Sequence, residues 1–373
     1  MESSHPPIYV TQPYLPPLEE FLPYLQQIWE SRVLTNNGPF HQQLEEELCK
    51  YLGVQYISLF ANGTLALVTA LQALKLSGEV ITTPFSFVAT THALWWNNIQ
   101  PVFVDIEPDT FTLDPDKIEA AITPRTTGIL PVHVYGYPCK VERIAEIARR
   151  YGLKVLYDAA HTFGAKYNEQ HLCSFGDMSI LSFHATKVFN TFEGGAIVCH
   201  TAEMKERIDN LKNFGFRGET TVVAPGINAK MNEFQAALGL AQLKHVDQAI
   251  ARRKEIALQY RKALANVPGI QCMDEQPGLT HNYSYFPVLL EESTYGKSRD
   301  ALYETLRENN IFARRYFYPL ITDFPTYRGK MNEERRSDKV AVGLSNSVLC
   351  LPIFPELDTE KLDYIIELIT RPI

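Results

Sequence analysis

Short apolar runs alternate with amphipathic segments along the first two thirds of the chain. Helical spacing of apolar residues recurs at 18–29, where Pro23 starts or kinks the helix, and at 41–52, 65–76, 141–151 and 202–213. The apolar runs are brief and bounded by polar or glycine residues, which predicts buried strands at 56–60, 79–83, 102–105, 128–134, 153–157, 178–183 and 196–199. Such strands alternating with helices predict an α/β fold, with a mostly parallel sheet of the seven-stranded type sandwiched by helices.

The pattern changes in the last third of the chain. A long helical pattern opens after the turn at 225–235 and continues to about residue 267. The elements predicted after it are a strand at 283–290 with one solvent-exposed face, a helix at 297–310, a short strand at 311–314 and a closing amphipathic helix at 360–369. Because 373 residues exceed one ordinary core, we predict a large domain over residues 1–245 and a smaller α+β domain over 246–373.

Composition and charge exclude several classes of protein. With 45% hydrophobic and 21% charged residues the chain is an ordinary globular one, and its net charge of −8 argues against binding to nucleic acid or to a membrane surface. The six cysteines lack Cys-x-x-Cys spacing, which favours reduced thiols in the cytoplasm. We expect no membrane span, since no apolar run approaches ~20 residues. We also expect no signal peptide. A bound metal is not expected, since no His-Glu-x-x-His motif occurs.

A lysine and an aspartate follow two of the predicted strands. Lys187 comes after the run at 178–183, and Asp158 ends the run at 153–157. A lysine at the mouth of a buried sheet is poorly solvated, so its amine can be free to form an imine with a carbonyl compound. A carboxylate at a strand's C-terminal end can keep the pyridine nitrogen of pyridoxal phosphate protonated. Alone, the lysine could be a solvated loop residue and the aspartate a helix cap; together they favour a pyridoxal 5′-phosphate site.

A candidate phosphate site lies at the turn Ala61-Asn-Gly-Thr64, between a predicted strand and a helix. Backbone N–H groups of Gly63 and Thr64 would face an anion there, and the helix N-terminus adds partial positive charge. Thr64 could equally be the N-cap of the helix.

The motifs Ser182-Phe-His-Ala-Thr-Lys187 with Glu193-Gly-Gly, and Asp158-Ala-Ala-His161, resemble the signature of the DegT/DnrJ family of sugar-nucleotide aminotransferases. The likeness runs from about Leu34 to the C-terminus. It implies the fold of aspartate aminotransferase (fold type I), pyridoxal 5′-phosphate as cofactor, and Lys187, Asp158 and His161 as catalytic residues.

The resemblance also assigns the remaining contacts to the cofactor. It places the phosphate at Gly63 and Thr64 with a hydroxyl from Ser182, stacks Phe87 on the ring face in preference to Phe85, and directs His161 to the phenolic oxygen. It implies a homodimer with shared active sites, because Asn228 would reach the cofactor phosphate of the neighbouring subunit.

Several basic residues keep two interpretations each. The family's basic position near Asn228 holds Lys230, which cannot bind a phosphate bidentately and could be simply solvated. Arg217 stands alone in its loop. Arg314 and Arg315, beside two tyrosines, could bind a diphosphate or form part of a solvated surface.

For function, the resemblance implies amino transfer from L-glutamate to a nucleotide-linked keto sugar, for surface polysaccharide (O-antigen) or glycan biosynthesis. The expected acceptor is dTDP-4-keto-6-deoxyglucose, giving dTDP-4-amino-4,6-dideoxyglucose; a 3-keto acceptor stays open, because that branch shares the motifs. Lys187 argues against the dehydratase branch, which has histidine there. A dinucleotide-dependent oxidoreductase would need Gly-x-Gly-x-x-Gly, which the turn at 61–64 lacks. A non-catalytic regulator with the same fold remains an alternative.

Overall fold

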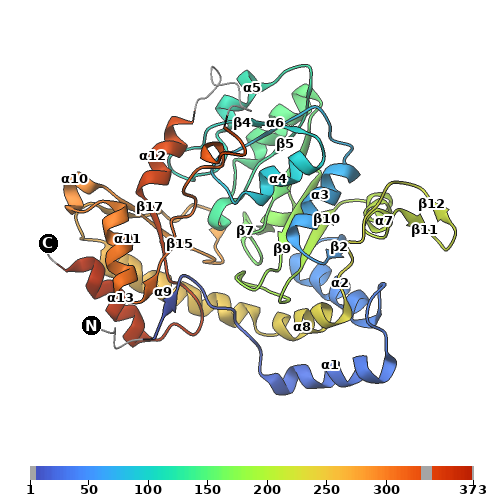
Figure 1. Ribbon diagram of the computed structural model, residues 1–373, viewed down its shortest axis with the longest axis horizontal. Helices are drawn as coiled ribbons and strands as arrows, with labels where there is room; N and C mark the ends of the chain where they lie inside the picture. The colour runs from blue at the N-terminus through green and yellow to red at the C-terminus, as the bar shows by residue number, and fades with distance from the viewer. Residues whose placement is uncertain (1–5, 329–337, 372–373) are drawn as a thin grey trace.

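A computed structural model describes residues 6–328 and 338–371 of the protein. Its centre is a seven-stranded sheet flanked by helices (Figure 1). Across the sheet the strands are β2 (Tyr56–Phe60), β10 (Gly195–Cys199), β9 (Met178–Ser182), β6 (Lys154–Asp158), β5 (Thr126–Leu130), β3 (Glu79–Thr82) and β4 (Gln100–Phe103). Only β10 runs antiparallel to its neighbours; the other adjacent pairs are parallel. The predicted α/β fold with a mostly parallel sheet is confirmed.

Alternate residues of the sheet face two layers of helices. On β10, Ala196 and Val198 pack with Leu44 and Leu240, whereas Ile197 packs on the other face with the helices after β2 and β3. The helices of these layers are α1 (Leu18–Ser31), α2 (Pro39–Leu52), α3 (Gly63–Ala73), α4 (Ala89–Trp96), α5 (Ile118–Ala121), α6 (Val141–Tyr151), α7 (Ala202–Leu211) and α8 (Glu233–Leu243). Pro23 lies inside α1 and does not start it.

The C-terminal part is built on a second, antiparallel sheet of β13 (Ile270–Cys272), β15 (Phe286–Leu290) and β17 (Val348–Leu351). Its helices are α9 (Val246–Leu264), α10 (Glu292–Tyr295), α11 (Arg299–Glu308), α12 (Lys339–Ser347) and α13 (Thr359–Thr370). Strand β1 (Ile8–Tyr9) pairs with β16 (Ile311–Phe312), which brings the N-terminal segment beside this part. The division of the chain at residue 245 stays a prediction.

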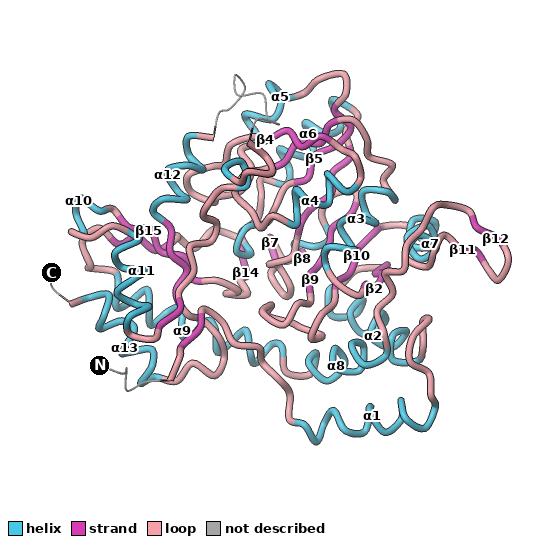
Figure 2. The backbone as a smooth tube through the Cα atoms, viewed as in Figure 1, coloured by secondary structure: helices cyan, strands magenta, loops and turns pink. Residues whose placement is uncertain are grey.

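Two small sheets complete the fold. Strands β7 (Lys166–Tyr167), β8 (Gln170–His171) and β14 (Leu279–Thr280) form one. Strands β11 (Phe216–Arg217) and β12 (Thr221–Val222) form a hairpin that projects from the body of the molecule (Figure 2). In the part of the chain that the structure describes, short 3₁₀ segments lie at Pro115–Lys117, Val134–Gly136, Leu172–Ser174 and Ile321–Asp323.

The predicted long helix after residue 235 is wrong as a single element, because α8 and α9 are separated at Lys244 and His245. The His245 side chain lies 3.0 Å from the Glu20 carboxylate of α1, and Lys244 lies 3.8 Å from it. The break thus coincides with a tertiary contact that local spacing does not encode. Within residues 6–328 and 338–371, no helix is both long enough and apolar enough to cross a membrane. All six cysteines are free thiols.

Candidate active site

Adjacent parallel strands bring Asp158 and Lys187 to one edge of the main sheet. Asp158 is the last residue of β6, and β6 pairs with β9, whose C-terminal end leads into the turn that carries Lys187. The backbone N–H of Lys187 donates to the His184 carbonyl at 2.8 Å, which closes this turn. Burial raises the pKa of Asp158 and lowers that of Lys187, and the charge of each residue partly offsets the shift of the other.

The carboxylate of Asp158 is 5% exposed and held by two hydrogen bonds. Its Oδ2 accepts from the Thr90 hydroxyl at 2.8 Å, and its Oδ1 accepts from the Ala160 N–H at 3.1 Å. Burial raises its pKa, while both hydrogen bonds and Lys187 oppose that shift. The anion is therefore fixed in orientation by groups that favour its charged form. Sequence reasoning missed Thr90, because adjacent Thr90 and Thr91 cannot be told apart without the helical phase of α4.

Lys187 is half-buried, and burial lowers its pKa to about 8. At pH 7 about a tenth of the amine is therefore unprotonated, far more than for an exposed lysine, as the sequence-based argument expects of a poorly solvated lysine. Its Nζ donates to the Tyr285 hydroxyl at 3.3 Å. Tyr285 is a second residue missed by sequence reasoning, because it falls in the segment predicted as an ordinary strand.

His161 lies on the turn after Asp158 and is 5% exposed. Its Nδ1 accepts from the Tyr135 N–H at 3.1 Å, so in the neutral ring the proton resides on Nε2. Burial and the charge of Lys187 hold its pKa well below the usual value. His161 is therefore a neutral ring whose Nε2 can donate a hydrogen bond. His133, in contrast, is a buried core histidine whose Nδ1 accepts from the Cys139 N–H at 3.0 Å.

The candidate phosphate site is a tight junction of three backbone segments. Helix α3 begins at Gly63 and is capped by Asn62, which accepts from the Leu65 N–H at 2.9 Å, so Thr64 is not its N-cap. A Cβ on Gly63 would lie 3.1 Å from Ser182 Cβ, and a Cβ on Gly195 would lie 2.7 Å from the Gly63 nitrogen. The glycines thus let a helix N-terminus, a threonine and the Ser182 hydroxyl converge, which fits a phosphate group.

The aromatic pair after β3 divides between core and surface. Phe85 is fully buried, with its ring edge-to-face against Phe111, Tyr135 and Phe317. Phe87 is 59% exposed, and its carbonyl accepts from the Thr90 N–H at 3.2 Å, one turn from the group that holds Asp158. Phe87 therefore has a free ring face near the site; its stacking on a cofactor stays a prediction.

Asn228 is exposed, and it lies one residue before Ala229, whose carbonyl accepts from the Ala61 N–H of the candidate phosphate turn at 2.8 Å. Asn228 forms a bridge with Asn213 and belongs to the stem that returns from the β11–β12 hairpin. The Lys230 ammonium donates to Asn213 Oδ1 at 2.8 Å and lies 4.9 Å from the centre of the Phe214 ring. The cation of Lys230 is thus held against its own hairpin stem.

The other candidate arginines differ in how they are held. Arg217 pairs with Glu206 at 3.0 Å, and Arg315 pairs with Asp300 at 2.9 Å and stacks against Tyr318. Arg314 is exposed. A binding role for any of them stays a prediction.

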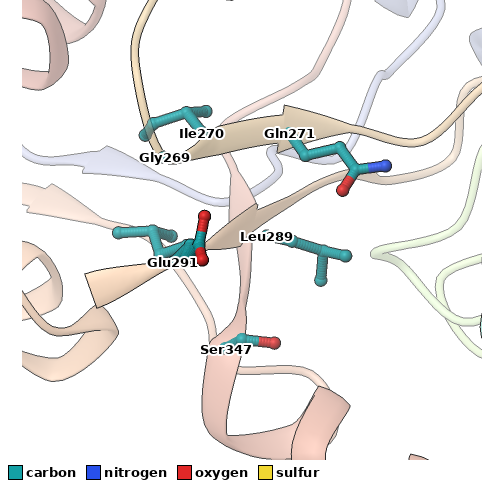
Figure 3. A pocket seen from close by; sticks show the side chains of 7 residues that line it. Gly269, Ile270, Gln271, Leu289, Glu291 and Ser347 are labelled. Atoms are coloured by element: carbon teal, nitrogen blue, oxygen red, sulfur yellow. The ribbon is translucent and has the colours of Figure 1, made fainter. Parts of the chain in front are cut away.

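A pocket on the C-terminal sheet is separate from the candidate site around Lys187 and Asp158 (Figure 3). Its lining comes from the edges of β13 and β15 and from the end of α12: Gly269, Ile270, Gln271, Leu289, Leu290, Glu291 and Ser347. The candidate site described above is built instead on the ends of β6 and β9.

The fold and this site together define an enzyme of the aminotransferase class. A model of the DegT/DnrJ/EryC1/StrS aminotransferase family matches residues 18–370, and the chain belongs to that family.

Known relatives and solved structures agree with this membership. The chain is 53% identical to a dTDP-4-amino-4,6-dideoxy-D-glucose transaminase of Shigella dysenteriae, over 97% of this chain and 98% of the relative. A protein of the same description from Escherichia coli is also 53% identical, over 95% of each chain. The crystal structure of DesI with its TDP-sugar product superposes with a TM-score of 0.94 at 35% identity, covering 99% of this chain and 93% of DesI.

Proposed function

We propose that the protein transfers the amino group of L-glutamate to dTDP-4-keto-6-deoxyglucose, giving dTDP-4-amino-4,6-dideoxyglucose, with pyridoxal 5′-phosphate as cofactor. The observation that carries the reaction type is the half-buried Lys187 beside the buried Asp158 at one sheet edge. The 4-keto acceptor is favoured over a 3-keto one because two relatives named for the 4-amino product are 53% identical.

The residues of the site suit each part of that cofactor. Asp158 would pair with the pyridine nitrogen, His161 Nε2 would donate to the phenolic oxygen, and Phe87 would cover one ring face. Gly63, Thr64 and Ser182 would hold the phosphate. When bound, pyridoxal phosphate supplies a reactive aldehyde and a ring that withdraws electrons from the substrate carbon.

The side chains of this chain then divide the remaining work. Lys187, with a pKa of about 8, can both accept and return a proton at Nζ near neutral pH. The Asp158 carboxylate, fixed by Thr90 and Ala160, supplies a negative charge that does not have to reorient during the reaction.

The proposal includes a homodimer with shared sites. Around the β11–β12 hairpin, apolar side chains are exposed that a second copy of the chain would cover: Phe214, Phe216, Val222, Val223 and Ile227. Docking of this hairpin would bring Asn228 to the partner's phosphate. Six free thiols support a cytoplasmic location, where the amino sugar would be made for surface polysaccharide.

The central test replaces Lys187 by alanine. With glutamate and a panel of nucleotide-linked 3- and 4-keto sugars, wild type should aminate the 4-keto sugar, with the product identified by mass and NMR. Lys187→Ala should lose at least about 10²-fold in turnover, because no other amine replaces its proton transfer. Lys154→Ala, which removes an exposed lysine at the opposite end of β6, should turn over like wild type.

Three results would contradict the proposal. Undiminished turnover by Lys187→Ala removes the lysine from the chemistry, and amination only of 3-keto sugars assigns the other branch. Cofactor binding without any amino transfer by wild type indicates a regulator.

A further inference from the structure

Tyr285 is the contact of Lys187 that neither the sequence motifs nor the site assignment above explains. It directly precedes β15, so it reaches Lys187 from the C-terminal sheet, whereas Asp158 and Lys187 belong to the main sheet. The Lys187 Nζ donates to its hydroxyl at 3.3 Å and lies 5.8 Å from the centre of its ring. Asp158 and His161 are the other titratable groups that act on Lys187 or feel its charge.

The Tyr285 ring is held on several sides. His161 meets it edge-to-face at 4.8 Å between centroids, and the rings of Tyr135 and Tyr316 lie at 5.6 and 5.7 Å. The residues just before it are tied to the same histidine, because the carbonyl of His161 accepts from Asn282 Nδ2 and from the Ser284 hydroxyl, both at 2.8 Å.

We propose that Tyr285 is a positioning residue for Lys187, and that its hydroxyl fixes the direction of the Nζ lone pair whenever the lysine amine is free. An amine that donates one N–H to a fixed acceptor can rotate little about its last bond. Its lone pair is then directed away from Tyr285, and the proposal places the reacting carbon on that side of Nζ. This role rests on the proposed amino transfer.

The proton balance of this role is simple. In the half-reaction with glutamate, Nζ would accept the proton that leaves the donor's α-carbon, becoming an ammonium, and give it up to the cofactor. In the half-reaction with the keto sugar, Nζ would take one proton back and deliver it to the acceptor carbon. Tyr285 gains and loses none, because burial raises the pKa of its phenol and keeps it neutral. It accepts a hydrogen bond from the amine and a stronger, charge-assisted one from the ammonium.

The test is Tyr285→Phe, which removes the hydroxyl and keeps the ring. The turnover of both half-reactions, with glutamate and with the keto sugar, should fall about 10- to 100-fold, with KM for the sugar nucleotide unchanged, because the same amine serves both. The visible absorbance of the loaded protein should persist, which reports an assembled site. Tyr327→Phe is the control, since that buried hydroxyl has no hydrogen-bond partner among the described residues.

A second measurement is independent of turnover. In the full chain freed of cofactor, the pH midpoint for labelling of Lys187 by an amine reagent, followed by mass spectrometry, should fall by about one unit in Tyr285→Phe, because the ammonium loses an acceptor. An unchanged midpoint with wild-type turnover in both half-reactions overturns the role of Tyr285. A higher KM at unchanged turnover also overturns this role, because it would mean that the Tyr285 hydroxyl contacts the substrate. Failure of wild type to transfer an amino group would instead reject the proposed function.

Discussion

At the scale of single residues, the site depends on side chains that hold the two charged groups in place. Thr90 shows this most directly, because its hydroxyl is one of the two donors to Asp158 and is itself 2.9 Å from the Ser86 hydroxyl. A carboxylate buried at 5% exposure needs such donors to remain ionised. Thr90 therefore supports the charge that the proposed pairing of Asp158 with the cofactor nitrogen requires.

Thr90→Val should shift the acidic limb of the pH profile of kcat/KM toward higher pH by about one unit. Burial already raises the pKa of Asp158, and removal of a hydrogen bond that favours the anion raises it further, so a higher pH is needed to ionise the group. The matched control is Thr91→Val, because the buried Thr91 hydroxyl makes no hydrogen bond within the described chain. Equal profiles for the two variants would contradict this role of Thr90.

The candidate site residues could be predicted unevenly from sequence. Asp158 and Lys187 were identifiable because each follows an apolar run that can only be a buried strand, and parallel strands share an edge. Thr90 and Tyr285 were not, since their roles depend on which way a helix face and a strand end point after packing. The family resemblance added His161 and Ser182. In the structure, the hydrogen bond to His161 Nδ1 defines the tautomer of that ring, and Ser182 lies beside Gly63.

At the scale of secondary-structure elements, a partly buried ionic cluster joins α2, β2 and α7. Glu45 and Asp209 pair with Lys205 at 2.9 and 2.7 Å, and Lys212 pairs with Asp209 at 2.8 Å and donates to the Ser58 hydroxyl at 2.8 Å. Burial favours a raised pKa for Glu45, but His41 and the two lysines hold it well below its usual value. The carbonyl of Lys212 also accepts from the Ala229 N–H at 3.0 Å, which anchors the hairpin stem.

Lys212→Ala should lower the free energy of unfolding by about 1–3 kcal/mol, because it leaves the partly buried carboxylates of Glu45 and Asp209 with one lysine. Its side chain is 7% exposed, so water does not replace the lost partner. Urea unfolding followed by circular dichroism measures the effect. The control is Lys50→Ala, which breaks an exposed pair with Glu47 and should barely move the midpoint. An unfolding midpoint equal to that of wild type for Lys212→Ala would show that the cluster does not stabilise the fold.

Elements differ in how far the sequence specifies them. Strands such as β2 and helices such as α6 have the predicted bounds, because their apolar spacing and flanking turns are local signals. The separation of α8 from α9 is not local, since it coincides with the contact of His245 with Glu20 on another helix. Strand β15 begins three residues later than predicted because Asn282 and Ser284 bond to the His161 carbonyl and not to a strand.

At the scale of the whole molecule, the question is whether each chain forms its own site or two chains share their sites. The projecting hairpin bears on this, because its stem carries Asn228. In one chain, Asn228 is exposed, and so are apolar side chains of the hairpin and its stem, such as Val222 and Ile227. If the hairpin enters a second copy, each site takes Lys187 from one chain and Asn228 from the other. Two inactive variants can then restore activity when they share a dimer.

Lys187→Ala and Asn228→Asp should each be inactive as homodimers, the second because an added carboxylate repels the phosphate. Coexpressed in equal amounts with different tags, they should regain about a quarter of wild-type turnover, since half of the random dimers are mixed and one of their two sites is intact. Purification through both tags should raise this to about half, because every dimer is then mixed. The control coexpresses Lys187→Ala with Asp158→Asn. Each site takes Lys187 and Asp158 from the same chain, so neither site of a mixed dimer has both residues, and no activity should return. No recovery in the test pair would place Asn228 in the site of its own chain. Recovery in the control would show that the restored activity does not report a site shared in this way.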